Sequence, residues 1–282
     1  MDWLLFALLA PLLMTLINFS DKFMMERHVP HAGALLLYFT FVNWVLMLIL
    51  WVIIGMPMLA TEDMLLLMFT GSLNVIGNIF YFRALSHEDT STITVLLQLM
   101  PVMTLILSVV LLREVPTVIQ FIGFVCIIVA AIGISYRPNT DLKTTGTQSL
   151  ILMSLTGFIW ALSAVLADSV LDRVVVDLES LFIVVIYTGL GYLPAGLLFY
   201  VSQPDARRAF NQQLRKTRLR PLPYILGIEA IFFARQATLF MAISLGSVAL
   251  VSVLGATSIF FGIVLGILFT ILFPAIYHED IR

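Results

Sequence analysis

The sequence predicts an all-α protein that crosses a membrane many times. Of its 282 residues, 61% are hydrophobic and 11% are charged, whereas a soluble domain carries about 25% charged residues. The mean hydropathy is +1.05, and the apolar residues form long runs separated by short polar connections. Such runs are too long for barrel strands, and backbone groups in lipid must be paired internally, so each run predicts a helix.

The apolar runs predict nine membrane spans, because about 20 predominantly apolar residues cross the roughly 30 Å hydrocarbon core. The first run lacks the basic segment and the small-residue cleavage site of a signal peptide, so it is predicted to be a span. The short connections leave no room for a soluble domain. The predicted spans are residues 3–20, 33–55, 64–86, 91–112, 116–136, 148–171, 178–201, 222–244 and 247–273.

The basic residues predict the orientation of these spans, because cytoplasmic loops carry an excess of Lys and Arg. Only Arg113 and Arg173 lie between spans on one side. The other side holds Lys22, Arg27, Arg83, Arg137, Lys143, Arg207, Arg208, Arg215, Lys216, Arg218, Arg220 and Arg282. The count predicts an N-terminus outside the cytoplasm, with the basic segment 205–223 against the inner leaflet as a topology anchor or a site for anionic lipid.

The composition argues against several other classes of protein. The net charge is -2, and no basic face is available to follow a nucleic acid. The single cysteine, Cys126, forms no thiol cluster, and the histidines lack metal-ligand spacing, so neither a metal nor another cofactor is expected. The paired carboxylates lie in loops, without a nucleophile motif or a phosphate-binding loop, and we do not expect an enzyme.

Two parts of the chain resemble each other in the same order. The segment NFSDKFMMER (18–27) compares with VLADSVLDR (165–173), and FRALSHEDTSTITVLL (82–97) compares with MAISLGSVALVSVLG (241–255). Five helices in each copy is an odd number, so the second copy would be inserted upside down relative to the first. We therefore predict two inverted repeats, residues 1–137 with five helices and residues 138–282 with four. Inverted repeats of this kind are typical of secondary transporters, whose site lies near the midplane between the repeats.

The stretch 81–135 resembles the EamA domain of the drug/metabolite transporter superfamily. The resemblance rests on an aromatic residue before Ala-Leu, Pro101 inside the next helix, Glu114 at its end, and Gln120 and Gly123 opening a run that ends in Gly-Ile-Ser. Glu114 also has a structural explanation, as part of a helix cap.

The resemblance implies a ten-helix transporter, so we expect the tenth helix to be missing here. It also implies that both termini are cytoplasmic, whereas the charge count predicts an external N-terminus. The resemblance also implies that the protein exports amino acids, their analogues or similar metabolites.

Helix 64–86 carries a polar stripe. Asn74, Asn78 and Tyr81 recur at i, i+4 and i+7, so they share one face. An unpaired amide in hydrocarbon costs several kcal/mol, so this face must meet protein or water. The stripe predicts either hydrogen bonds between helices or a substrate-binding face.

Helix 222–244 carries Glu229, Arg235 and Gln236 within an apolar run. An intramembrane Arg costs about 2.5 to 3.5 kcal/mol, so it should face a cavity or a partner such as Asp21, Asp168 or Glu229. Six residues separate Arg235 from Glu229, which predicts that they point in different directions. We expect Arg235 to anchor an anionic substrate or to be a fixed counter-charge. Glu229 is either a proton carrier or close to the membrane interface.

We expect a ring of polar residues to be completed by Gln98, Thr94, Trp160 and Ser163. The alternative role of Trp160 is packing between helices. The substrate-binding residues are thus predicted to be Asn74, Asn78, Tyr81, Gln98, Trp160, Arg235 and Gln236. We expect a secondary transporter for a small polar or amphipathic metabolite, with membrane lipid as its other partner, in a bacterial inner membrane. The alternative is a membrane structural or regulatory subunit, or a lipid-handling partner, whose polar groups serve packing alone.

Overall fold

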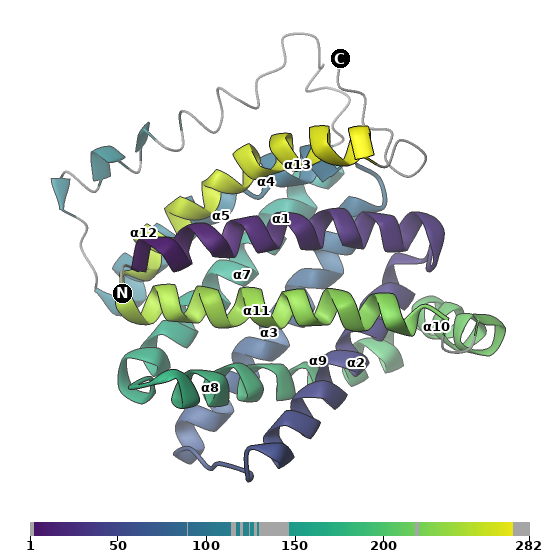
Figure 1. Ribbon diagram of the computed structural model, residues 1–282, viewed down its shortest axis with the longest axis horizontal. Coiled ribbons are helices and arrows are strands. Elements are labelled where there is room, and N and C mark those ends of the chain that lie inside the picture. The colour runs from purple at the N-terminus through teal and green to yellow at the C-terminus, as the bar shows by residue number, and fades with distance from the viewer. Residues whose placement is uncertain are drawn as a thin grey trace.

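The computed structural model describes residues 3–272 with gaps at 89, 114–116, 119–120, 124, 127–128, 130–146 and 218–219. All regular structure in these residues is helical, which confirms the all-α polytopic fold (Figure 1). The elements are α1 (Trp3–Arg27), α2 (Ala32–Ile53), α3 (Thr61–Leu85), α4 (Thr90–Leu96), α5 (Leu99–Leu107), η1 (Ser108–Leu112), α7 (Thr147–Val174), α8 (Leu178–Leu190), α9 (Tyr192–Ser202), α10 (Pro204–Thr217), α11 (Leu222–Leu245), α12 (Val248–Leu254), η2 (Gly255–Thr257) and α13 (Ser258–Leu272).

Eight helical stretches of the described chain are long and apolar enough to cross a membrane, and they coincide with eight of the nine predicted spans. The remaining prediction, 116–136, lies largely outside the described residues. Large apolar side chains on the outer surface, such as Ile53, Val201 and Ile271, are about two-thirds or more exposed. Exposed side chains of this kind are the surface that lipid covers.

The first span is longer than predicted. Helix α1 continues to Arg27 instead of ending at residue 20, because Asp21 and Lys22 both have protein partners within the bundle. The helix therefore carries the Asp21 side chain into the protein interior, where it is 4% exposed.

Three spans that the sequence suggested to be continuous are interrupted. The predicted span 178–201 consists of α8 and α9, because Pro194 has no N–H for the carbonyl of Leu190. Pro101 has the same effect on the carbonyl of Leu97, so α4 ends and α5 begins there. The last span is interrupted by the 3₁₀ turn η2 between α12 and α13.

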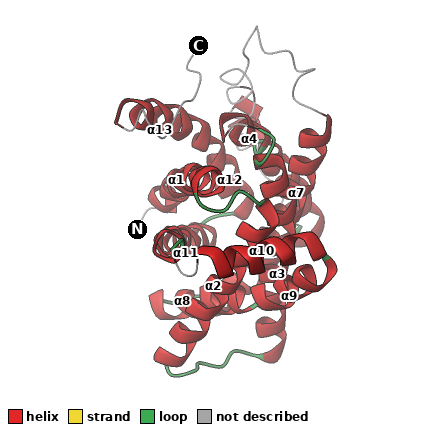
Figure 2. Ribbon diagram, turned by 90° about the vertical axis from the view of Figure 1, so that its right-hand side faces the viewer, coloured by secondary structure: helices red, strands yellow, loops and turns green. Residues whose placement is uncertain are grey.

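Most of helix α10 lies in the segment 205–223, which was predicted to be a loop because it has no apolar run. Its residues Pro204–Thr217 place Ala206 and Phe210 against the bundle and leave charged residues outside. The ring of Phe210 lies 4.7 Å from that of Tyr38, and Gln213 donates a 2.7 Å hydrogen bond to the carbonyl of His28. Helix α10 therefore packs across the ends of α2 and α9 (Figure 2).

The centre of the bundle is made by two pairs of helices in extensive contact. One pair is α1 and α11, which lie side by side, and the other is α3 and α7 (Figure 1). Helix α3 also approaches α8 and α9 so closely that Gly71 and Gly191 have no room for a side chain. Residues of all four helices line a central cavity.

Candidate functional site

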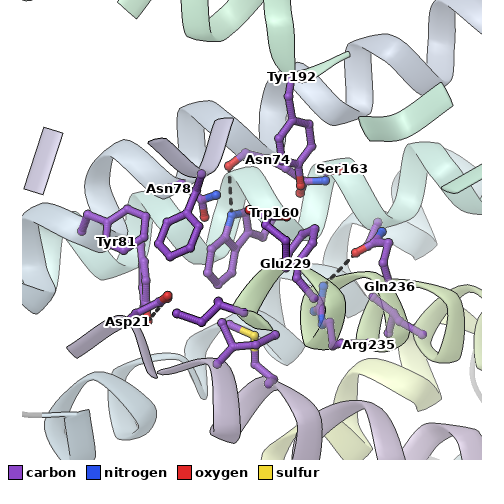
Figure 3. A pocket seen from close by; sticks show the side chains of 18 of the residues that line it. Asp21, Asn74, Asn78, Tyr81, Trp160, Ser163, Tyr192, Glu229, Arg235 and Gln236 are labelled. Atoms are coloured by element: carbon purple, nitrogen blue, oxygen red, sulfur yellow. Dashed lines mark hydrogen bonds between the residues drawn. The ribbon is translucent and has the colours of Figure 1, made fainter. Parts of the chain in front are cut away.

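A cavity with about 860 Å³ of empty space, partly open to the surroundings, lies between α1, α3, α7, α9 and α11. The polar side chains around it are Asp21, Asn74, Asn78, Tyr81, Trp160, Ser163, Tyr192, Glu229, Arg235 and Gln236 (Figure 3). Residues from segments far apart in the sequence thus meet in one partly apolar space.

Two asparagines of the predicted stripe face this cavity. Asn74 and Asn78 both line it, and neither side-chain amide forms a hydrogen bond with another described residue. The sequence left open whether these amides join helices or face a substrate path. Their position in the cavity without protein partners favours the second alternative, because amides that held helices together would be paired.

The third member of the stripe, Tyr81, is paired within the protein. Its hydroxyl lies 3.0 Å from Oδ1 of Asn18 and 3.2 Å from Oδ2 of Asp21, both on α1. A hydroxyl carries one hydrogen, so it donates fully to only one of these oxygens at a time. Asn18 also keeps an unpartnered Nδ2. Tyr81 therefore ties α3 to α1 and places the Asp21 carboxyl at the cavity wall.

Glu229 is 4% exposed and accepts a 2.6 Å hydrogen bond from Nδ2 of Asn43 on α2. Oδ1 of Asn43 has no partner. If the amide rotates by half a turn, Oδ1 can accept a hydrogen bond from the protonated acid, so Asn43 can serve both protonation states of Glu229. No cation of the described chain forms an ion pair with this carboxyl.

Arg235 has no carboxylate partner among the described residues. None of the three predicted partners, Asp21, Asp168 and Glu229, forms an ion pair with it. One terminal nitrogen donates a 3.0 Å hydrogen bond to Oε1 of Gln236, and Nε is buried without a partner. The guanidinium thus keeps its charge and part of its donor capacity available to a ligand.

Glu229 and Arg235 both line this cavity, although six residues separate them along α11. Figure 3 shows the Asp21–Tyr81 pair and the Arg235–Gln236 pair on opposite sides of it, with Trp160 and Glu229 between them. The cavity is wide enough, and the arginine side chain long enough, for both charged groups to reach it from different faces of α11.

Trp160 lies at the wall of the cavity and is held by α3. Its Nε1 donates a 3.4 Å hydrogen bond to the carbonyl of Asn74, and its ring lies against Gly77, where a Cβ would come within 2.5 Å of the indole. The ring centroid is 5.6 Å from that of Tyr81. Trp160 therefore packs between helices, and it also borders the cavity.

Gln98 is separate from the other predicted binding residues. It lies at the break between α4 and α5 and donates hydrogen bonds to the carbonyl of Thr94 at 2.9 Å and to Oγ of Ser258 at 3.4 Å. It does not line the central cavity and borders a neighbouring one. The predicted ring of polar residues is thus divided between two spaces.

Three polar residues of the site escaped the sequence analysis or were assigned another part in it. Asp21 was considered only as an ion-pair partner, and Asn43 and Tyr192 were not considered. Asn43 could have been found, because a single amide within the apolar helix α2 needs a partner for the same reason as Asn74. Tyr192 follows the break after α8, which no apolar pattern announces.

The fold and the cavity define a polytopic membrane protein with a polar, charge-bearing site enclosed by its helices. Residues 1–136 match the model of the EamA-like transporter family. This family is part of the drug/metabolite transporter superfamily, so the first part of the chain is similar to its EamA-type members. The match and the apolar helices together support a membrane transporter. A comparison with curated proteins gives no significant match.

Within the described residues, no group of three or more His, Cys, Asp or Glu side chains is arranged to hold a metal ion. Two residues on which the family resemblance rests, Glu114 and Gln120, lie outside the described residues.

Proposed function

We propose that the protein is a secondary active transporter that exports a small polar or amphipathic metabolite, amino acid-like or related, by alternating access. The observation that carries the proposal is Arg235, a partly buried guanidinium that lines a central cavity without a carboxylate partner among the described residues. An unpaired intramembrane charge is costly and is retained where it binds a ligand or an ion. The bacterial inner membrane is the location that suits a chain with such short loops.

In this proposal Arg235 binds the carboxylate or another anionic group of the substrate. Asn74 and Asn78, with free amides, and Gln236, next to the guanidinium, bind its other polar atoms. Asp21 on the opposite wall is suited to an amino group, which supports an amino acid-like cargo. Trp160 and Tyr81 bound the space between these groups, and Gln98 acts from the neighbouring cavity.

We propose further that residues 1–137 and 138–282 are inverted repeats. An exchange of the two halves would convert the α1–α11 contact into the α7–α3 contact, and these are the two most extensive helix contacts in the described chain. The same exchange relates the break before α5 to the break at η2. Interrupted helices in corresponding positions of the two halves are typical of transporters built from inverted repeats.

Two polar contacts at opposite ends of α3 support alternating access. At its first turn, Asp63 forms a 2.5 Å ion pair with Arg173 at the end of α7. At the other end of α3, Lys22 of α1 donates hydrogen bonds to the carbonyls of Leu85, the last helical residue, at 3.2 Å and of Glu88 at 3.0 Å. Contacts of this kind can open one at a time, so that the cavity faces one side of the membrane and then the other.

The proposal is tested by the accessibility of the cavity from the two sides. Cys126 is replaced by alanine, Asn78→Cys is introduced, and a membrane-impermeant thiol reagent is applied to right-side-out and to inside-out vesicles. Alternating access predicts labelling from both sides, because each vesicle population samples both states. A cysteine at the lipid-facing Ile53 is the control and should stay unlabelled by the polar reagent. No labelling of Asn78→Cys from either side would favour a packing role for the polar groups.

Glu229 is proposed to carry the coupling proton, since it is buried and bonded to an amide that can serve both its charged and its neutral form. Glu229→Gln is expected to leave downhill movement of the cargo intact and to abolish its accumulation against a gradient. The measurement is the ratio of outside to inside cargo concentration with and without a protonophore. The wild type should lose its cargo gradient when the protonophore is added, whereas Glu229→Gln should form no cargo gradient in either condition. Glu62→Gln, at the exposed start of α3, is the matched control, and a proton-dependent gradient in Glu229→Gln would contradict the assignment.

A further inference from the structure

A second cavity, which Gln98 borders, lies beside the central one. It holds about 730 Å³ of empty space, also partly open, between α1, the break before α5, α7, α11 and the α12–η2 segment. Six residues line both cavities, namely Met14, Met100, Trp160, Ala164, Arg235 and Leu239. The two spaces therefore share one wall, and Arg235 is the charged group in that wall.

The second cavity differs from the first in chemistry. Small or apolar residues such as Ala7, Ala10, Ile243 and Val251 form most of its lining, and Arg235 is its only charged residue among those described. The central cavity, in contrast, contains two carboxyl groups and two free amides in addition to Arg235. A ligand that spans the shared wall thus meets a polar space on one side and an apolar space on the other.

Two unpaired polar atoms lie at this second cavity. Nε of Arg235 is a buried donor without an acceptor, and Oε1 of Gln98 is a buried acceptor without a donor. Gln98 itself is 8% exposed, and its amide nitrogen is already used by Thr94 and Ser258. Buried polar atoms without partners are rare in folded proteins, and both of these atoms belong to residues that line the second cavity.

We propose that the second cavity is a subsite for the apolar part of the transported molecule. The substrate is then an organic anion whose carboxylate binds Arg235 at the shared wall. Its aromatic or branched aliphatic group occupies the second cavity, with room for one donor group toward Gln98. This inference rests on the proposed function and makes it narrower, because it distinguishes an amphipathic anion from a small, wholly hydrophilic one.

Gly255 offers a way to fill the second cavity without disturbing the first. It lines only the second cavity, has helical backbone angles, and would place an added Cβ at no contact within 4 Å. Gly255→Leu therefore puts a side chain into the open space. Gly227→Leu is the matched control, because Gly227 is also free of contacts within 4 Å and lines neither cavity.

The experiment measures the affinities of the purified full-length protein for acetate and phenylacetate, from the concentration dependence of its thermal stabilisation and of its tryptophan fluorescence. The wild type and Gly227→Leu are expected to bind phenylacetate at least tenfold more tightly than acetate. Gly255→Leu should lose this preference and bind acetate with unchanged affinity. Arg235→Gln should bind both anions at least tenfold more weakly than the wild type.

The outcomes separate this inference from the function on which it rests. If Gly255→Leu keeps the preference for phenylacetate, or if the wild type has none, the apolar subsite is wrong while anion binding at Arg235 stands. If Arg235→Gln binds both anions as well as the wild type, or if the wild type binds neither, the anion anchor itself is overturned, and the subsite with it.

Discussion

Replacement of Arg235 by glutamine is expected to lower the affinity for the transported anion by about 10- to 100-fold and to leave the amount of folded protein unchanged or higher. The first effect follows from the loss of a charge-assisted hydrogen bond, worth about 1.5 to 3 kcal/mol, when about 1.4 kcal/mol corresponds to a factor of ten. The second follows from the cost of about 2.5 to 3.5 kcal/mol that a membrane helix bears for an arginine. Arg235 has no ion-pair partner in the described chain that its removal would leave unpaired.

The two effects together distinguish a binding residue from a structural one. If Arg235 were one half of an inert buried ion pair, its loss would strand a carboxylate and destabilise the protein by about 3 to 5 kcal/mol. The measurement is transport of the cargo alongside the thermal unfolding of the purified protein. Arg208→Gln, on the outer face of α10 where the arginine is 71% exposed, is the control with the same change in charge. An unstable Arg235→Gln with unimpaired transport would contradict the assignment.

Replacement of Gly71 by alanine is expected to prevent the protein from folding normally. An added Cβ would lie 1.8 Å from the carbonyl oxygen of Thr188 in α8, and backbone atoms cannot move aside as a side chain can. Overpacking of a core by single methyl groups already costs about 1 to 3 kcal/mol, and a contact with backbone should exceed that range. Because α3 carries Asn74, Asn78 and Tyr81, separating it from α8 would also displace the site.

The measurement for Gly71→Ala is the yield of monodisperse protein in detergent and its unfolding temperature, compared with those of Gly227→Ala. Gly227 lies in α11, where an added Cβ meets nothing within 4 Å, so its replacement should be neutral or slightly stabilising. A Gly71→Ala protein as abundant and as stable as Gly227→Ala would show that α3 and α8 are less tightly packed than the structure indicates.

Long apolar runs made most of the fold predictable. A run of about 20 apolar residues has few structural alternatives in a bilayer, so helices such as α2, α7 and α11 follow from length and hydropathy alone. The breaks were harder to predict. Proline is tolerated within membrane helices when neighbours satisfy the freed backbone groups, and Pro11 inside α1 interrupts nothing, whereas Pro101 and Pro194 do. Whether a proline interrupts its helix depends on the packing of neighbouring helices.

Helix α10 was missed for a different reason. Its apolar residues, Ala206 and Phe210 among them, occupy one face between charged residues, and such a segment has a low mean hydropathy. The helical period of Ala206, Ala209, Phe210 and Gln213 was nevertheless present in the sequence and would have predicted an amphipathic helix.

The sequence predicted which site residues share a face of one helix, but not which residues of other helices they meet. The i, i+4, i+7 spacing placed Asn74, Asn78 and Tyr81 on one face, and the cost of polar groups in lipid directed that face inward. Partners from other helices follow from tertiary packing, which no single helix encodes. Asn43 and Glu229, for example, are 186 positions apart in the chain. The same limitation explains why Arg235 was assigned potential carboxylate partners that it does not have.

The most direct test of the proposed function is an untargeted comparison of metabolites inside and outside cells that overproduce the wild type, Arg235→Gln or Arg208→Gln at matched levels. We predict at least one anionic metabolite that accumulates outside cells with the wild type and with Arg208→Gln, and that stays inside cells with Arg235→Gln. If no metabolite distinguishes Arg235→Gln from the wild type, Arg235 is no substrate anchor and the polar groups of the cavity serve the architecture of the bundle.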